Sequence, residues 1–293
     1  MICAPSITPP DPNPKTPKSR IPAGACDCHF HVFDGPSPQI AQRSYTATPA
    51  PLSAYKAVQS ALGTDRAIIV QPSIYGTNNQ TTLQSLPKDG SMKAIVVVDD
   101  TADIEELKSL ADQGAVGVRV NMLFSSDARL ENLSNLARKM AELDWHLQVL
   151  ADVSELPNLR EFVSRLPVPV VFDHMGHLPS QKGINDPGFK SLLKLLEEGQ
   201  VWVKLSGAYR LAPSNSVDYR EVAPIAKALV EANSDRLVWG SDWPHPSFDG
   251  HMPNDGDLLD HLFDWANAQT AKKILVDNPQ RLYGFEKPGA SDE

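Results

Sequence analysis

The sequence CDCHFHVF, residues 26–33, places two cysteines and two histidines within six positions. The run is short and apolar and follows Gly24, which predicts a β-strand, where successive side chains point to opposite faces. Alternate positions then form two sets: Asp27, His29 and His31 on one face, and Cys26, Cys28 and Phe30 on the other. We expect the histidines to face a polar site and the cysteine face to pack beneath helices, because cysteine is among the most buried residue types.

Seven further runs rich in Val, Ile or Leu follow this stretch, and segments with helical spacing of apolar residues separate them. The predicted strands cover residues 25–33, 66–71, 93–99, 116–121, 146–151, 168–174, 201–206 and 236–240. Strands that alternate with helices in this way predict an α/β fold, a (β/α)8 TIM-type barrel that forms a single domain over residues 23–293. An open doubly wound sheet is the alternative, but no glycine-rich phosphate loop follows any predicted strand.

Residues 1–22 differ from the rest of the chain, because seven of these 22 residues are proline. Such a composition predicts an extended N-terminal arm that is either disordered or laid over the surface. The arm lacks the basic start and apolar core of a secretory signal. No apolar run in the chain approaches the roughly 20 residues that span a bilayer. We therefore expect a cytoplasmic protein with no membrane segment.

The overall charge argues against some classes of partner. The net charge is −9 and the isoelectric point is about 5.4, which disfavours nucleic acid because phosphates require a basic surface. A few arginines inside a cleft can still bind a small anion. Three cysteines, Cys3, Cys26 and Cys28, are too few for a disulfide framework in a chain of 293 residues.

Charged side chains gather at the ends of several predicted strands. In a (β/α)8 barrel the carboxyl ends of the strands carry the chemistry. The residues at these ends, besides the two histidines of the first strand, are Arg119, Asp173, His174, His177, Lys204, Arg210, Asp242 and His245. A lone charge at a strand end is usually a cap or a surface pair, but this coincidence on several strands predicts one site.

At this point the sequence resembles a known family. His29-x-His31, PVPVVFDHMG at residues 167–176 and WGSDWPHP at residues 239–246 resemble the amidohydrolase superfamily, most closely its branch of 2-pyrone-4,6-dicarboxylate lactonases. The resemblance extends from about Gly24 to NPQRLYGF at residues 278–285. It implies a hydrolase that opens the lactone ring of a carboxylate-bearing small molecule, in the catabolism of aromatic compounds or acids.

The resemblance also implies roles for individual residues. Asp242 matches the aspartate that deprotonates the attacking water, and three histidines match those around the substrate carbonyl: His29, His31 and His174. Four residues match substrate contacts, of which the two arginines hold carboxylates: Arg119, Arg210, Tyr45 and Ser73. His245, three residues after Asp242, is close enough to orient that aspartate or to touch the substrate.

Two departures from the branch bear on the substrate. The pyrone lactonases carry a second arginine six residues after the one matched by Arg119, where this chain has Ser125. They also carry a tyrosine on the fifth strand, where this chain has Leu150. A bidentate arginine–carboxylate pair is among the stronger hydrogen-bonding units. We therefore expect lactone hydrolysis to be retained and the preferred acid to differ.

The need for a metal is the remaining question about the chemistry. Many amidohydrolases bind zinc or a similar ion, and here the ligands would be His29, His31, His174 and Asp242. The middle strands offer no lysine or glutamate to bridge two ions, and the pyrone lactonases work without metal. We expect no required cofactor, although a single divalent metal such as zinc could bind.

Other activities use the same barrel and stay open as alternatives. One is a metal-dependent decarboxylase of an aromatic or unsaturated acid, for which a firmly bound metal would be diagnostic. Another is a sugar-lactone hydrolase or isomerase, which would favour hydroxyl contacts over arginines. A binding or scaffold protein would leave the set of acid–base residues without a purpose. The sequence does not indicate the oligomeric state.

Overall fold

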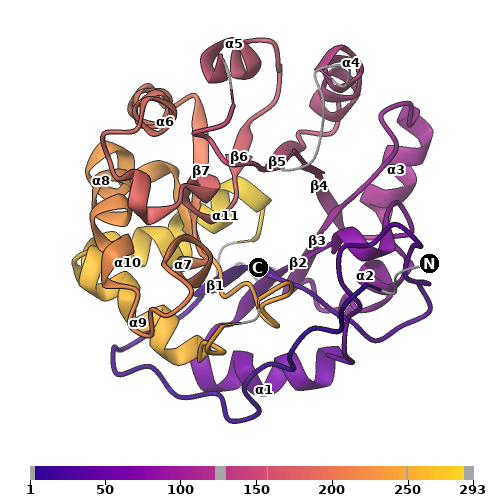
Figure 1. The fold of residues 1–293 in the computed structure, drawn as a ribbon. Helices are drawn as coiled ribbons and strands as arrows, with labels where there is room; N and C mark the ends of the chain where they lie inside the picture. The colour runs from indigo at the N-terminus through magenta and orange to yellow at the C-terminus, as the bar shows by residue number, and fades with distance from the viewer. Residues whose placement is uncertain (1–3, 123–129, 157, 249, 287–293) are drawn as a thin grey trace, which may run out of the picture.

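Eight parallel strands form the centre of the molecule and pair in sequence order, from β1 to β8 (Figure 1). The computed structural model describes residues 4–122, 130–156, 158–248 and 250–286. The strands are β1 (Cys26–Phe30), β2 (Arg66–Val70), β3 (Met92–Val96), β4 (Ala115–Asn121), β5 (His146–Leu150), β6 (Val170–Phe172), β7 (Val201–Leu205) and β8 (Leu237–Trp239). The segment after β8 completes the ring, since Phe30 bridges Trp243 and the amide of Asp242 donates to the carbonyl of His29 at 2.7 Å. The predicted (β/α)8 barrel is confirmed.

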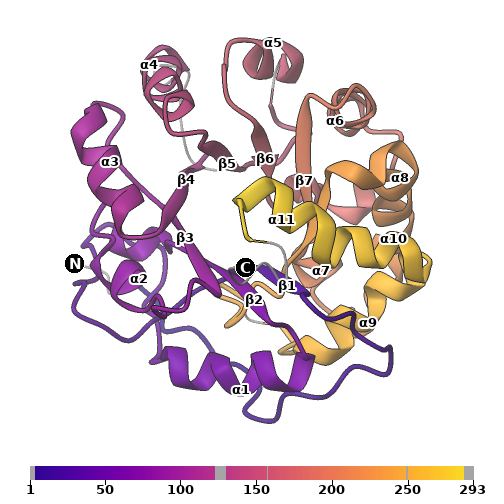
Figure 2. The same cartoon turned by 180° about the vertical axis from the view of Figure 1, so that it is seen from behind.

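Helices follow the strands and surround the barrel (Figures 1 and 2). They are α1 (Leu52–Leu62), α2 (Gln80–Gln84), α3 (Ile104–Asp112), α4 (Leu130–Ala141), α5 (Leu159–Ser164), α6 (Pro187–Glu197), α7 (Ala208–Leu211), α8 (Ala223–Asn233), α9 (Asp255–Trp265), α10 (Ala268–Lys272) and α11 (Asn278–Tyr283). Side chains that accept from a first-turn amide begin three of the longer helices, namely Asp103 for α3, Asp186 for α6 and Asn254 for α9. Within the described residues, no helix is both long enough and apolar enough to cross a bilayer.

Two buried apolar layers hold the barrel together. The outer layer lies between strands and helices, and on β2 it includes Ala67 and Ile69. The inner layer fills the barrel, and on β2 it includes Ile68 and Val70. Tyr283 at the end of α11 and Phe285 just after it belong to the inner layer, and α11 lies over one end of the ring of strands (Figure 2). The site is therefore left to the opposite, carboxyl end of the strands.

The side chains of strand β1 do not alternate regularly between the two faces of the sheet. Asp27 lies opposite Ala67 and Phe30 lies opposite Ile69. Between these two pairs the chain moves three residues along β1 but only two along β2. This irregularity is a β-bulge, in which Cys28 and His29 together face one residue of β2. After the bulge the side chains change faces relative to a regular strand.

The bulge corrects the expected division of β1 into two faces. Phe30 belongs to the outer layer and stacks on Tyr55 of α1, as expected for a residue beneath helices. Asp27 also points outward, because Tyr55 donates to its carboxylate at 3.0 Å. Cys26 and Cys28 instead belong to the inner layer. The prediction that the cysteines pack beneath helices on the face of Phe30 was wrong, as was the placing of Asp27 with the histidines.

Candidate active site

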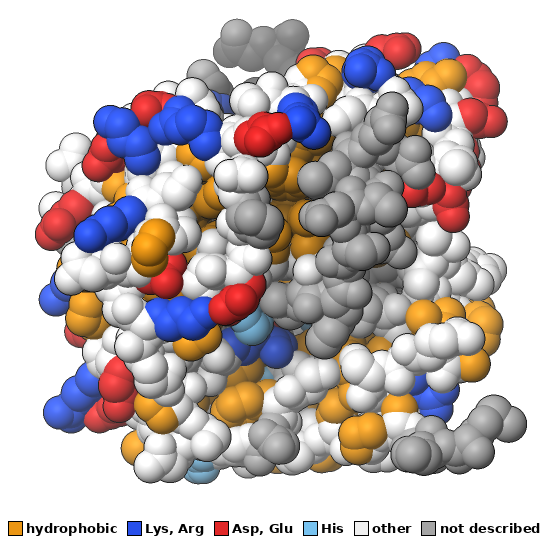
Figure 3. Space-filling model, turned by 45° about the horizontal axis from the view of Figure 1, so that its top comes forward, with side chains coloured by type: hydrophobic (Ala, Val, Ile, Leu, Met, Phe, Trp, Pro, Cys, Tyr) orange, Lys and Arg blue, Asp and Glu red, His pale blue; other side chains and the backbone are white. Residues whose placement is uncertain are grey.

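A cavity of about 270 Å³ opens at the carboxyl end of the strands. Figure 3 shows basic and histidine side chains in a recess of one face of the molecule. Almost every strand or the loop after it contributes to the lining, which consists of His31, Ser44, Tyr45, Pro72, Ser73, Arg119, Asn121, Leu150, His174, His177, Arg210, Asp242, Pro246 and Ser247.

Asp242 lies directly after β8 at the base of this cavity and is fully buried. Its Oδ2 accepts hydrogen bonds from the Tyr209 hydroxyl at 2.5 Å and from Nε of Arg210 at 2.6 Å. Burial alone would raise the pKa of this carboxyl, but Arg210 and the nearby histidines hold the pKa well below its ordinary value. Asp242 is therefore ionised at neutral pH, and its Oδ1 has no hydrogen-bond partner among the described residues.

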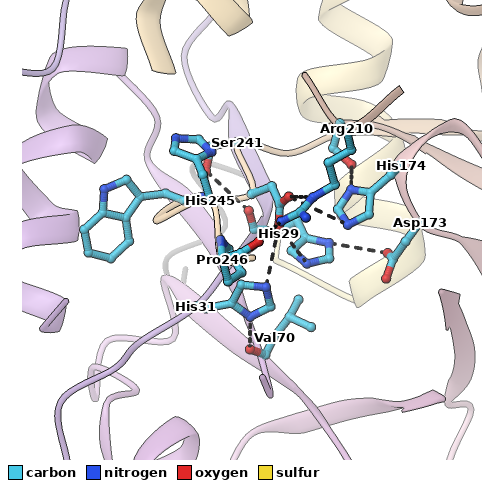
Figure 4. A network of polar contacts seen from close by, with 12 residues as sticks. His29, His31, Val70, Asp173, His174, Arg210, Ser241, His245 and Pro246 are labelled. Atoms are coloured by element: carbon cyan, nitrogen blue, oxygen red, sulfur yellow. Dashed lines mark hydrogen bonds and ion pairs between the residues drawn. The ribbon is translucent and has the colours of Figure 1, made fainter. Parts of the chain in front are cut away.

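His31 and His29 approach this unpartnered oxygen (Figure 4). Nδ1 of His31 lies 2.7 Å from the carbonyl oxygen of Val70, which can only accept, so the proton of the neutral ring is on Nδ1. Nε2 of His31 then carries a lone pair 3.5 Å from Oδ1 of Asp242. Nε2 of His29 lies 3.6 Å from the same oxygen. Burial lowers the pKa of both histidines, that of His29 to about 3, so both rings are neutral at neutral pH.

His174 completes the group of histidines. It follows β6 with a left-handed backbone, at φ 49°, which turns its ring toward His29 with 4.8 Å between the ring centroids. Its Nδ1 lies 2.9 Å from the Ser206 hydroxyl, and its Nε2 lies 3.8 Å from Oδ2 of Asp242. Burial again lowers the pKa well below its ordinary value. His174 also lines the cavity, so a neutral imidazole faces any bound ligand.

A second carboxylate, Asp173, lies beneath the histidines. Nε of Arg119 donates to its Oδ2 at 3.1 Å, and the Gln148 amide donates to the same oxygen at 3.0 Å. Its Oδ1 lies 3.4 Å from Nδ1 of His29 and 3.6 Å from Nζ of Lys204. Although burial acts to raise its pKa, the neighbouring His29 and Lys204 hold that pKa well below the ordinary value. Asp173 therefore ties His29 to a buried charged network.

Lys204, one of the predicted strand-end charges, points into the barrel and is fully buried. Its ammonium donates to the carbonyl of Cys28 at 2.9 Å and to the amide oxygen of Gln148 at 2.7 Å. Burial lowers its pKa. These partners explain how a lysine is tolerated at this depth, since a buried charge requires pairing and hydrogen bonds.

The charges of the site do not cancel. Among the described residues, three cations, Arg119, Lys204 and Arg210, accompany two carboxylates, Asp173 and Asp242. With neutral histidines the sum of these five groups is three minus two, or +1. A ligand with a negative charge would therefore be attracted to the cavity, despite the net charge of −9 on the whole chain.

The structure brings most of the predicted site residues together. Those that line the cavity are His31, His174, Asp242, Arg119, Arg210, Tyr45 and Ser73, and His29 lies directly beneath them. Leu150 also lines the cavity, whereas Ser125 lies outside the described residues. His245 is not part of the lining. It is fully buried, its Nε2 lies 3.3 Å from Asp255, and its placement does not support the predicted contact with substrate.

Two important residues were missed by the sequence reasoning. Tyr209 immediately precedes Arg210, and its proximity to a predicted arginine was the only available signal. Gln148 on β5 carried no signal beyond its place on a predicted strand, yet it joins Lys204 to Asp173. Both act on residues of other strands, and such pairings depend on how the barrel closes.

The donor atoms at the base of the cavity would suit a metal ion. His29, His31 and Asp242 offer ligand atoms that lie within 4.8 Å of one another. Nε2 of His29 and Oδ1 of Asp242 are buried without a hydrogen-bond partner among the described residues. Imidazole nitrogen and carboxylate oxygen are common zinc ligands. A second group, His29, Asp173 and His174, is less suitable for a metal ion. The carboxylate of Asp173 is already paired with the side chains of Arg119 and Lys204.

Comparison with known proteins places this geometry in context. A sequence model of the amidohydrolase family matches residues 26–285. The chain is 36% identical to a 4-sulfomuconolactone hydrolase of Hydrogenophaga intermedia, over 92% of both chains. It is also 36% identical to a 2-pyrone-4,6-dicarboxylate hydrolase of Comamonas testosteroni, over 94% of this chain and 95% of the relative.

A solved structure agrees with the sequence relatives. It is a probable 2-pyrone-4,6-dicarboxylic acid hydrolase of Acinetobacter baumannii with citric acid bound, which superposes with a TM-score of 0.80. The two proteins are 28% identical, and the match covers 89% of this chain and 100% of the other.

Proposed function

The chain belongs to the amidohydrolase family, and we propose that within this family it hydrolyses the lactone ring of a small molecule that carries a carboxylate or similar anion. The observation that carries this proposal is the convergence of two imidazole nitrogens, Nε2 of His29 and of His31, on the ionised Oδ1 of Asp242. The relatives that hydrolyse 4-sulfomuconolactone and 2-pyrone-4,6-dicarboxylate support the reaction class and a role in the catabolism of aromatic compounds.

These three atoms are suited to holding the attacking water. A water molecule between them donates its protons to Oδ1 of Asp242 and to Nε2 of His31, which carries a lone pair. Its remaining lone pair is then directed toward the ligand in the cavity. As the water attacks the lactone carbonyl, the ionised Asp242 takes its proton, which is general base catalysis.

His174 is the histidine best placed to stabilise the developing oxyanion. When the Ser206 hydroxyl donates to Nδ1 of His174, the ring proton is on Nε2 and is directed away from Ser206. His31 cannot act in this way while neutral, because its proton is on Nδ1 and is donated to Val70. The equal roles expected of the three histidines thus become two water-holding rings and one oxyanion donor.

The anionic group of the substrate would bind to the arginines. Arg119 and Arg210 both line the cavity, together with the hydroxyls of Tyr45 and Ser73. Arg119 is held by the bond from its Nε to Asp173 and also lines the cavity, where its guanidinium can meet an anion. Charge-assisted bonds of this kind also orient the substrate, which places the lactone carbonyl near the water.

The substrate would differ from the pyrone dicarboxylates in at least one of the groups that contact the cavity wall. Leu150 presents an apolar side chain to the cavity where those enzymes carry a tyrosine. A hydroxyl or carboxylate directed at this point would lose a partner, and an apolar group would be favoured. We therefore propose a substrate that has its anionic group near Arg119 and Arg210 and an uncharged part near Leu150.

We propose that the reaction needs no metal. If a divalent ion binds, His29, His31 and Asp242 would hold it, and it would act as a Lewis acid on the carbonyl or the water. The charge of the site argues against such an ion, because Arg210 already neutralises Asp242 and the five charged groups sum to +1. The cytoplasm remains our proposed location, from the sequence alone.

The test compares Asp242→Asn with the parent enzyme. Asp242 has a left-handed backbone, φ 65°, which asparagine adopts readily, so the variant should fold. Since an amide cannot take a proton from water, kcat for hydrolysis of a carboxylated lactone should fall by at least about 10²–10⁴-fold. The matched control is Asp264→Asn, an exposed residue on α9, which should retain parental kcat.

The assay would use 4-sulfomuconolactone, 2-pyrone-4,6-dicarboxylate and neutral six-membered lactones, with metal-stripped and zinc-loaded protein. A ring-opened acid is the expected product. Release of carbon dioxide would point to the decarboxylase alternative, and a rearranged lactone would point to the isomerase. Parental turnover in a folded Asp242→Asn protein would exclude the proposed mechanism.

A further inference from the structure

The N-terminal arm contacts two parts of the chain that follow cavity-lining residues in sequence, Thr46 after Tyr45 and helix α9 after the loop with Ser247. Residues 4–22 run in extended conformation along the outside of the barrel (Figure 1). Their contacts concentrate at two points, which we call the first anchor, at Thr46, and the second anchor, at the start of α9. Both points are far from the arm in the sequence, so both are tertiary contacts.

The first anchor joins the arm to the loop between β1 and α1. Ser6 forms a parallel bridge with Thr46. The amide of Thr46 donates to the carbonyl of Pro5 at 2.7 Å, and the amide of Ile7 donates to the carbonyl of Thr46 at 3.0 Å. The hydroxyl of Thr46 also donates to the carbonyl of Ala4 at 2.9 Å. The arm thus satisfies every backbone and side-chain donor that Thr46 offers.

Thr46 directly follows Ser44 and Tyr45, two residues of this loop that line the cavity. Tyr45 is buried at 5% exposure, and Ile7 of the arm, which pairs with Thr46, is buried at 8%. The pairing of Thr46 therefore fixes the backbone next to Tyr45. A loop between a strand and a helix would otherwise be among the more mobile parts of the chain.

The second anchor joins the arm to α9. Asn254, the N-cap of α9, donates to the Asp11 carboxylate at 2.8 Å and accepts from the amide of Lys15 at 3.0 Å. The amides of Lys18 and Ser19 donate to the Asp260 carboxylate, each at 3.0 Å. These bonds hold the arm in one position relative to the helix.

The approach at the second anchor is close. A Cβ atom added to Gly256, in the first turn of α9, would lie 2.3 Å from the carbonyl oxygen of Lys15. Helix α9 follows the loop that begins at β8 and supplies Asp242, Pro246 and Ser247 to the cavity. The arm therefore connects the loop that holds Tyr45, on one side of the cavity, with the start of α9.

We propose that residues 4–19 are part of the substrate-binding apparatus, in which they act as a strap that holds Tyr45 in place against the cavity. The inference rests on the proposed function for the meaning of the cavity, and it goes beyond that function because it gives the arm a role in binding. Residues of the strap position Tyr45 and do not touch the reacting atoms.

Three variants weaken the strap at different points. Deletion of residues 2–9 removes the first anchor, and Gly256→Ala forces the arm away from α9. Thr46→Val removes the hydroxyl bond to Ala4 of the arm together with the bond that the same hydroxyl accepts from Nε of Arg43. Each should raise KM for a carboxylated lactone and change kcat by less than about twofold, with the deletion near tenfold in KM, the scale of one misplaced hydrogen-bonding contact. Lys108→Ala on α3 is the control, because it removes only an exposed ion pair with Glu105 and leaves every contact of the arm in place.

A double-mutant cycle separates positioning from general loss of structure. In a Tyr45→Phe background the hydroxyl is already gone, so the deletion of residues 2–9 should raise KM by less than about twofold more. An equally large rise in KM in both backgrounds, or a fall in kcat that matches the rise in KM, would overturn the proposal.

Amide hydrogen exchange supplies a readout that needs no substrate. Deletion of residues 2–9 should increase exchange at residues 45–47 at least tenfold and leave β4 and β5 protected. Unchanged exchange at residues 45–47 would overturn the strap. Faster exchange in a protein whose parent hydrolyses no lactone would instead reject the proposed function and leave the strap standing.

Discussion

At the scale of single residues, the site depends on where protons are fixed. His31 gives its one proton to Val70 and so presents a lone pair to Asp242, whereas Nδ1 of His29 lies between the Asp173 carboxylate at 3.4 Å and the Lys204 ammonium at 3.5 Å. The residue types were predictable from the sequence, but these proton positions were not, because the carbonyl of Val70 and the carboxylate of Asp173 come from other strands.

The pH dependence of the reaction follows from the lowered pKa values. Asp242 remains ionised well below its ordinary pKa, and the pKa of His29 is about 3. As pH falls from 8 to 5, neither group gains a proton, so kcat/KM should stay flat over this range. The measurement is a pH–rate profile on protein shown to be folded at each pH. A loss of activity centred near pH 6.5, the ordinary value for histidine, would contradict the neutral rings.

The two arginines should differ in their effects. Arg119→Met removes a cavity cation that is bonded to Asp173, so it should mainly raise KM for a carboxylated lactone. Arg210→Met also removes the partner of Asp242, so it should change kcat as well as KM. A charge-assisted bond contributes about 1.5–3 kcal/mol, which corresponds to about 10–100-fold in KM. Steady-state kinetics with a carboxylated and a neutral lactone separate the effects, and equal losses on both lactones would show that the arginines are structural.

At the scale of elements, the order and type of the strands were predictable, because eight apolar runs alternate with helical segments. The β-bulge in β1 was not predictable. Counting in twos along the strand placed Phe30 correctly and failed for Cys26 and Cys28, because an extra residue enters the ladder between Asp27 and Phe30. The histidines remained correctly placed since both follow the inserted residue.

The revised position of Cys26 changes what its substitution should do. Its thiol is fully buried in the inner apolar layer. Cys26→Ser would place a hydroxyl in that layer and should lower the free energy of unfolding by about 1–3 kcal/mol. Cys26→Ala is the matched control, since it removes the sulfur without adding a polar group. Urea unfolding measures the difference between them, and a serine variant as stable as the alanine variant would show that the hydroxyl finds a partner.

At the scale of the whole molecule, the barrel buries many ionisable groups in neutral or paired form. His146, at the start of β5, is an example outside the cavity, where it packs edge-on against Tyr283. Burial lowers its pKa to about 3. Asp27 shifts in the opposite direction, since burial raises its pKa to about 6. The sequence predicted that these residues lie on strands. It did not predict how deeply their side chains are buried, because that depends on how the ends of the barrel are closed.

These shifts determine how stability changes with pH. An unfolded chain protonates a histidine near pH 6.5, whereas folded His29 and His146 resist protonation until about pH 3. The unfolded state therefore binds more protons between these values, and the free energy of unfolding should fall as pH falls from 6.5 toward 3. Asp27 opposes this trend between about pH 6 and its ordinary pKa of 3.8, because there the folded state holds the extra proton. Its single proton is outweighed by the protons of the two histidines.

His146→Gln tests this linkage without touching the cavity. The variant removes one of the groups that resist protonation, so its free energy of unfolding should fall less steeply below pH 6.5 than that of the parent, by up to one proton equivalent. Urea unfolding at half-unit steps from pH 7.5 to 4.5 gives both slopes. Gln113→Asn is the control, because that exposed residue carries no titratable group and its substitution should leave the slope unchanged. Parallel curves for parent and His146→Gln would mean that His146 takes up its proton in the folded barrel, which would require an acceptor or water at the closed end of the strands.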